Sequence, residues 1–133
     1  MKKSILCLMV LVSLCIFCVG CGKSEVDVAR EKSMITADIK TAEQIVKIVK
    51  IAIDDEKIEN QINNGYKKCS DVDGLIGEYL MGENTPLSLE NGNYYIKAEN
   101  DIVKVVIATS EEEANEVTEQ YDGTKSGIAY VSE

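Results

Sequence analysis

A helical pattern of apolar residues between Met34 and Ile53 is the most regular feature of the chain. Apolar residues recur there at steps of three and four, so that they share one side of a helix. They are Ile35, Ile39, Ala42, Val46, Val49 and Ile53. Polar residues, mostly lysines, occupy the opposite side. The pattern predicts a long amphipathic helix on which a smaller layer packs.

The helix is expected to begin between Glu25 and Lys32, with Ser24 or Asp27 as its N-cap. Only its second half is strongly apolar. We therefore expect the second half to face the core, and the first half to be exposed or to contact another chain.

Two short segments follow the long helix. Lys57–Tyr66 is polar and ends in Asn63-Asn64-Gly65, which favours a turn. Asp71–Met81 has an acidic residue at its start and an apolar face made by Leu75, Ile76, Tyr79 and Leu80. This second segment predicts a short helix.

The next part of the chain predicts a β-hairpin. Tyr94–Glu99 and Ile102–Thr109 are rich in β-branched and aromatic residues. They are joined by Asn100-Asp101, a two-residue polar connection typical of a hairpin. Alternation within the second strand places Val103, Val105 and Ile107 on one face. The other face receives Ile102, Val106 and Ala108, with Lys104.

The last part of the chain predicts a short helix and a final strand. Ser110 begins a capping box that predicts an acidic helix to about Gln120. Ser126–Ser132 can form the last strand. The expected fold class is therefore α+β: one long N-terminal amphipathic helix packed on a small antiparallel β-sheet.

The N-terminal residues have the pattern of an export signal. Lys2 and Lys3 precede an apolar run from Ile5 to Val19. The run is shorter than the roughly 18 to 20 residues that a spanning helix needs, and small residues follow it. It ends in Cys18-Val19-Gly20-Cys21, which resembles the bacterial lipobox.

The resemblance to a lipobox implies cleavage after Gly20 and a diacylglyceryl group on the sulfur of Cys21. Residues 1–20 would then be a lipoprotein signal peptide, residues 21–28 a tether, and residues 29–133 the folded domain. Cys18 stands where Leu is usual in a lipobox. An ordinary secretory signal and an uncleaved anchor are the alternatives.

The charge of the chain narrows the classes of partner. The 14 basic and 23 acidic residues give a formal net charge of −9, and no His is present. Cleavage after residue 20 would remove two lysines and no acid, which leaves a formal net charge of −11. This balance argues against nucleic acid and against electrostatic docking on anionic lipid.

The absence of His removes Ser-His-Asp and Cys-His catalytic pairs and the usual zinc sites. We expect no enzyme activity, no cofactor and no metal, although a carboxylate hydrolase stays formally open. After processing, Cys69 is the one free thiol, so no intramolecular disulfide can form. A small buried hydrophobe is its expected role, with reaction or pairing between chains as the alternative.

Two acidic segments have the composition of metal sites. Asp71-Val72-Asp73-Gly74 resembles part of a calcium loop, but the first and twelfth positions of that loop would be Cys69 and Leu80, where acids are required. Helix capping is the expected role of these aspartates. Glu111–Glu113, with Glu116 and Glu119, could bind a divalent ion, but a solvated helix face is the usual meaning of such a run.

Four tyrosines could form a carbohydrate-binding or adhesive face, and packing within the strands is the expected alternative. They are Tyr94, Tyr95, Tyr121 and Tyr130.

Two stretches of this sequence resemble the type IV pilin and pseudopilin family, in particular its clostridial members. Ala29–Ile53, AREKSMITADIKTAEQIVKIVKIAI, is similar to the C-terminal half of a pilin's first helix. Asn93–Ile107, NYYIKAENDIVKVVI, is similar to the strand pair of a pilin head. The resemblance covers roughly residues 30–107 and implies a pilin-like head domain that acts through protein contacts.

The N-terminus departs from the pilin pattern. A pilin leader ends in Gly, followed by Phe or Met, with Glu at the fifth mature position. The segment from Lys2 to Leu6 lacks both the Gly and the Glu. The resemblance and the lipobox together indicate a pilin-type head that carries a lipoprotein signal.

We therefore expect a non-enzymatic pilin-like protein, anchored by lipid on Cys21 to the extracytoplasmic face of the cell membrane. Its expected partner is a protein, such as a pilus or secretion component, or it serves in surface display. A ligand-binding or sensory lipoprotein of the cell envelope is the alternative, and it predicts a concave apolar pocket between helix and sheet.

Overall fold

The computed structural model describes residues 24–133 and divides the chain into residues 1–30 and residues 31–133. The sheet and the helix residues that pack on it belong to residues 31–133. The elements are α2 (Glu25–Ala52), α3 (Glu56–Ile62), β1 (Lys67–Lys68), the 3₁₀ turn η1 (Cys69–Asp71), β2 (Asn93–Glu99), β3 (Ile102–Ala108), α4 (Glu111–Glu116) and β4 (Gly127–Val131). The strands form one antiparallel sheet in the order β1-β2-β3-β4. The predicted α+β fold class is confirmed.

Helix α2 begins where the sequence predicts. The Ser24 hydroxyl accepts a hydrogen bond from the backbone N–H of Asp27 at 3.3 Å, so Ser24 is the N-cap. The helix ends at Ala52, and Asp55 then caps α3 by accepting from the backbone N–H of Lys57 at 3.0 Å. The two helices therefore join through a turn of only a few residues.

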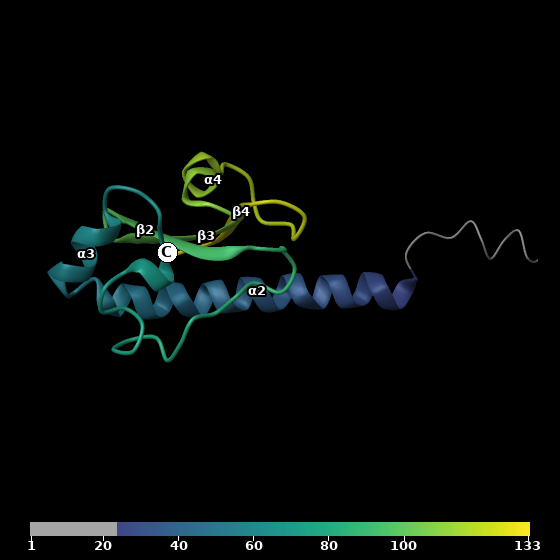
Figure 1. The fold of residues 1–133 in the computed structure, drawn as a ribbon, viewed down its shortest axis with the longest axis horizontal. Helices are drawn as coiled ribbons and strands as arrows, with labels where there is room; N and C mark the ends of the chain where they lie inside the picture. Colours follow the sequence, from purple (N-terminus) through teal and green to yellow (C-terminus); the bar gives the residue numbers. More distant parts are fainter. Residues whose placement is uncertain (1–23) are drawn as a thin grey trace, which may run out of the picture. The chain divides into compact units, whose positions relative to one another are not determined.

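The apolar side of α2 packs on one face of the sheet, which we call the inner face (Figure 1). The most deeply buried apolar residues of the helix are Ala42, Ile45, Val46, Val49 and Ala52. They share one hydrophobic cluster with Ile96, Val103, Val105 and Ile107 of the sheet. The second half of the helix is thus the core-facing half, as its pattern predicts.

A second, smaller cluster lies on the opposite, outer face of the sheet. It contains Tyr95, Val106, Ala108 and Ala114, with Tyr66, Val117 and Ile128 packed against it. Helix α4 lies over this face, on the other side of the sheet from α2 (Figure 1). The predicted alternation of β3 between two faces is confirmed.

The β2–β3 hairpin turns where predicted. Asn100 and Asp101 have φ of 51° and 66°, and a two-residue turn with positive φ at both positions is the type that matches the twist of a hairpin. Ser110 caps α4 by accepting from the backbone N–H of Glu113 at 3.2 Å. That helix ends at Glu116, earlier than the predicted Gln120, because Val117 adopts an extended conformation.

The predicted helix over Asp71–Met81 is wrong. Gly74 and Gly77 have φ of 86° and 94°, which lie outside the helical region and break the segment into turns. Its apolar residues still reach the core, since Leu75 and Leu80 are buried. Conversely, α3 was not predicted, although Ile58 and Ile62 lie four residues apart and are fully buried.

Candidate functional site

The predicted lipid-attachment site lies outside the described residues. The signal of residues 1–20, the cleavage position at Gly20 and the lipidated Cys21 all precede residue 24. Helix α2 begins at Glu25, so residues 25–28, which belong to the predicted tether, are helical. Within residues 24–133, no helix combines the length and the apolar character needed to cross a membrane.

Cys69 is buried at the start of η1, with 8% of its surface exposed. Burial raises the pKa of the thiol to about 12, because a thiolate would lose its hydration there. The thiol therefore stays protonated at neutral pH and is a poor nucleophile. The position matches the expected role of a small buried hydrophobe.

The tyrosines do not form an aromatic binding face. Tyr94, Tyr95 and Tyr121 are buried, with 3–6% of their surface exposed, and Tyr130 is half-buried against the inner cluster. Strand packing is therefore confirmed as the role of Tyr94, Tyr95 and Tyr130, whereas Tyr121 is buried from the loop between α4 and β4.

A buried polar network joins α2 to the loop before β2. The sequence did not predict this network. The Asp38 carboxylate, 1% exposed, accepts from the backbone N–H groups of Leu87 at 2.7 Å and Ser88 at 2.9 Å. The Ser88 hydroxyl also donates to this carboxylate and lies 2.6 Å from the Tyr121 hydroxyl. Tyr94 donates to the Asp38 carbonyl oxygen at 3.4 Å.

These contacts satisfy both carboxylate oxygens of Asp38 with protein donors. Burial raises the pKa of the Tyr121 hydroxyl to about 12, so this hydroxyl stays a donor at neutral pH. Because both oxygens of this buried carboxylate accept from protein donors, its role is structural. It fastens the loop and the segment around Tyr121 onto α2, and its signal in the sequence is a single acid on the apolar side of a helix.

One acidic residue of α4, Glu113, takes part in several side-chain hydrogen bonds. Glu113 accepts from the hydroxyl and backbone N–H of Thr109 and from the Ser126 hydroxyl, and these bonds lower the pKa of its carboxyl. Among residues 24–133, no group of three or more acidic or cysteine side chains is arranged to hold a metal ion.

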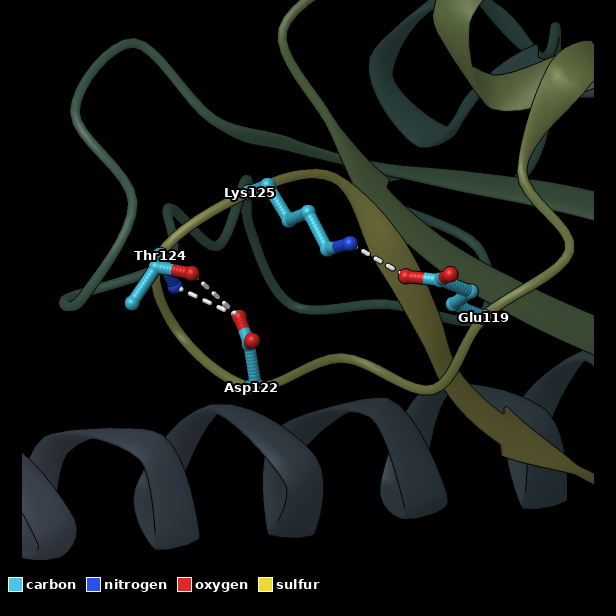
Figure 2. Close-up of polar contacts among 4 residues, drawn as sticks. All are labelled: Glu119, Asp122, Thr124 and Lys125. Carbon is cyan, nitrogen blue, oxygen red and sulfur yellow. Dashed lines mark hydrogen bonds and ion pairs between the residues drawn. The ribbon is translucent and has the colours of Figure 1, made fainter.

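The loop between α4 and β4 is ordered by its own polar contacts (Figure 2). Asp122 accepts from the backbone N–H of Thr124 at 2.9 Å and from its hydroxyl at 2.7 Å. Lys125 forms an ion pair with Glu119. Gly123, with φ of 86°, lies so close to Ile35 of α2 that a Cβ would stand 2.5 Å from the isoleucine side chain. The loop therefore lies directly on the helix.

One groove opens beside α2, between the helix and residues 79–84. It measures about 250 Å³ and is lined by Ile45, Ile48 and Tyr79 together with polar Thr41 and Gln44. It does not lie between the helix and the sheet, where fully buried side chains such as Val49, Ile96 and Val105 fill the space.

Comparisons with protein-family models, with curated proteins and with solved structures found no match to this chain. The likeness to pilins therefore rests on the residues of the chain itself.

Proposed function

We propose that this chain is a lipid-anchored, extracytoplasmic protein of pilin-like type that acts through contact with another protein. The observation that carries the proposal is the N-terminal pattern, in which two lysines, an apolar run and Gly20-Cys21 stand immediately ahead of a capped helix. A diacyl group on Cys21 supplies two acyl chains, which hold a protein firmly on a membrane.

The fold supports the pilin-like part of this proposal. The long helix α2 packs through its second half on an antiparallel sheet, which is the arrangement that the resemblance implies. Removal of residues 1–20 would leave no apolar helix ahead of α2, and such a helix is what a pilin uses in its filament core. A role beside a pilus or a secretion system, or in surface display, therefore fits better than polymerisation.

A non-enzymatic role is supported by the state of the reactive groups in residues 24–133. Within residues 24–133, Asp38 is the one buried acid, and both of its carboxylate oxygens accept hydrogen bonds from protein groups. Cys69 is buried and protonated. A hydrolase that uses two carboxylates needs a pair facing each other across a cleft, with one pKa raised.

The alternative, a ligand-binding or sensory lipoprotein, predicts a concave apolar pocket between helix and sheet. The filled interface between α2 and the inner face supports contact through the surface in preference to enclosure of a ligand.

The test of the anchor uses two cysteine variants in a bacterial host supplied with labelled palmitate. Cys21→Ser is expected to abolish lipid labelling and to release the protein from the membrane fraction. Cys15→Ser is the matched control, because it changes another cysteine of the signal that lies outside Cys18-Val19-Gly20-Cys21. Unchanged labelling of Cys21→Ser would refute the anchor.

A further inference from the structure

The outer face of the sheet is covered over only part of its area. Helix α4 and its neighbours cover the row that contains Tyr95, Val106 and Ile128. The next row lies closer to the hairpin turn. It contains Lys97, Lys104 and Val131, because Lys97 pairs with Lys104 across β2 and β3, and Lys104 pairs with Val131 across β3 and β4. The open sheet face, as we call it, consists of Lys97, Glu99, Ile102, Lys104 and Val131.

Each residue of the open sheet face is at least partly accessible. Ile102 and Val131 have 41% and 37% of their surface exposed, and both are large aliphatic side chains. The side chain of Lys97 is 28% exposed, and Lys104 is half-buried. The face therefore presents two aliphatic groups beside two ammonium groups.

The two lysines lie directly opposite each other on neighbouring strands, and like charges in that position destabilise a sheet. Glu99 pairs with Lys97, with nitrogen and oxygen 3.2 Å apart. Lys104 forms no ion pair within residues 24–133. The open sheet face thus keeps one uncompensated positive charge in a chain whose formal net charge is −9.

We propose that the open sheet face binds a protein segment that places a single carboxylate between Lys97 and Lys104 and aliphatic side chains against Ile102 and Val131. The proposal rests on the proposed function and names the chemistry of its partner. Neighbouring strands lie about 4.8 Å apart, and a carboxylate has two oxygens that can accept from both ammonium groups at once. The uncompensated charge of the face calls for one carboxylate on the partner, and the adjoining aliphatic groups call for aliphatic side chains.

Two other occupants fit the face less well. A second copy that used the same face would bring lysines against lysines around the two-fold axis. Attraction to an anionic membrane grows with the number of basic residues near its surface, and this face offers one uncompensated lysine on an acidic protein. A polyacidic partner would be repelled by the net negative charge of this chain, whereas a mostly apolar segment with one acid would not be.

The test measures binding of two fluorescent peptides to the full chain in phosphatidylcholine vesicles. One peptide alternates Val and Thr around a central Glu, and its control carries Gln in place of Glu. Wild type is expected to bind the Glu peptide about tenfold more tightly than the Gln peptide, as two partly exposed charge contacts allow. Lys97→Gln with Lys104→Gln is expected to abolish this preference.

The matched control is Lys32→Gln with Lys40→Gln, which makes the same change in net charge at exposed positions of α2 and is expected to keep the preference. The inference is overturned if wild type binds both peptides equally or if the control pair loses the preference as well. It is also overturned if Lys97 and Lys104 instead govern binding to phosphatidylglycerol vesicles.

The result of the peptide-binding test can be separated from the result of the lipid-anchor test. Lipid labelling at Cys21 is measured on the same preparations. A preference for the Glu peptide without lipid labelling overturns the anchor alone, whereas labelling without the preference overturns the inference alone.

Discussion

The two faces of the sheet differ in how completely they are covered. The inner face packs against the apolar side of α2, and its residues Ile96, Val103, Val105 and Ile107 are fully buried. The outer face has a short cover made by α4 and leaves a row of lysine and aliphatic side chains accessible. The inner face therefore holds the fold together, while the outer face contributes less to stability and is available for contact.

The largest expected effect compares two isoleucines on opposite faces of β3. Ile107→Ala empties a fully buried inner position and should lower the free energy of unfolding by about 2–5 kcal/mol. Ile102→Ala, at an exposed outer position, should cost less than about 1 kcal/mol. Denaturant unfolding measures both. Equal losses would contradict the difference between the faces.

The next effect concerns the buried carboxylate that fastens the loop before β2 onto α2. Asp38→Ala leaves the backbone N–H groups of Leu87 and Ser88 without their acceptor and should cost about 1–3 kcal/mol. Asp54→Ala, at an exposed position just after the helix, is the control and should change stability little. Hydrogen exchange at Leu87 and Ser88 should rise in the first variant only.

The cover of the outer face depends on a helix cap. Ser110→Ala removes the side-chain acceptor for the backbone N–H of Glu113 and should cost about 1 kcal/mol. Ser110→Asp keeps a capping oxygen and should restore the loss. Unfolding of both variants in denaturant provides the measurement. A loss that Asp does not restore would mean that the serine acts through something other than capping.

The smallest expected effect is on how the stability of the fold depends on pH. Hydrogen bonds from Thr109 and Ser126 lower the pKa of the Glu113 carboxyl below its ordinary value of 4.5. A lowered pKa contributes stability that is present above the unfolded-state pKa and is lost as the pH falls through the folded-state pKa. Wild type should therefore lose slightly more stability than Glu113→Gln on acidification below about pH 4. Identical pH profiles would contradict this.

The sequence was sufficient for the elements that local patterns determine. Helix α2 and the β2–β3 hairpin follow from periodicity and a two-residue polar turn. Capping chemistry left Ser24 and Asp27 open as the cap of α2, and the structure has Ser24. The failure at Asp71–Met81 has a local cause, since apolar spacing favoured a helix while Gly74 and Gly77 adopt positive φ. In that segment backbone conformation prevailed over apolar periodicity.

The features that depend on long-range pairing were not accessible from the sequence. Asp38 meets Leu87 and Ser88 about fifty residues later, so its role appears only once the loop is placed on the helix. The opposition of Lys97 and Lys104, by contrast, follows from the two-residue turn that the sequence predicts, whereas the part of the outer face left open follows from where α4 ends. These contacts decide which surface is available for a partner.

The most direct test of the account is the mass of the N-terminal peptide from protein isolated in the membrane fraction of an expressing bacterium. We expect a chain that begins at Cys21 and carries a diacylglyceryl group on the sulfur of that residue. A chain that begins at Met1, or one that contains Cys21 without lipid, would contradict it.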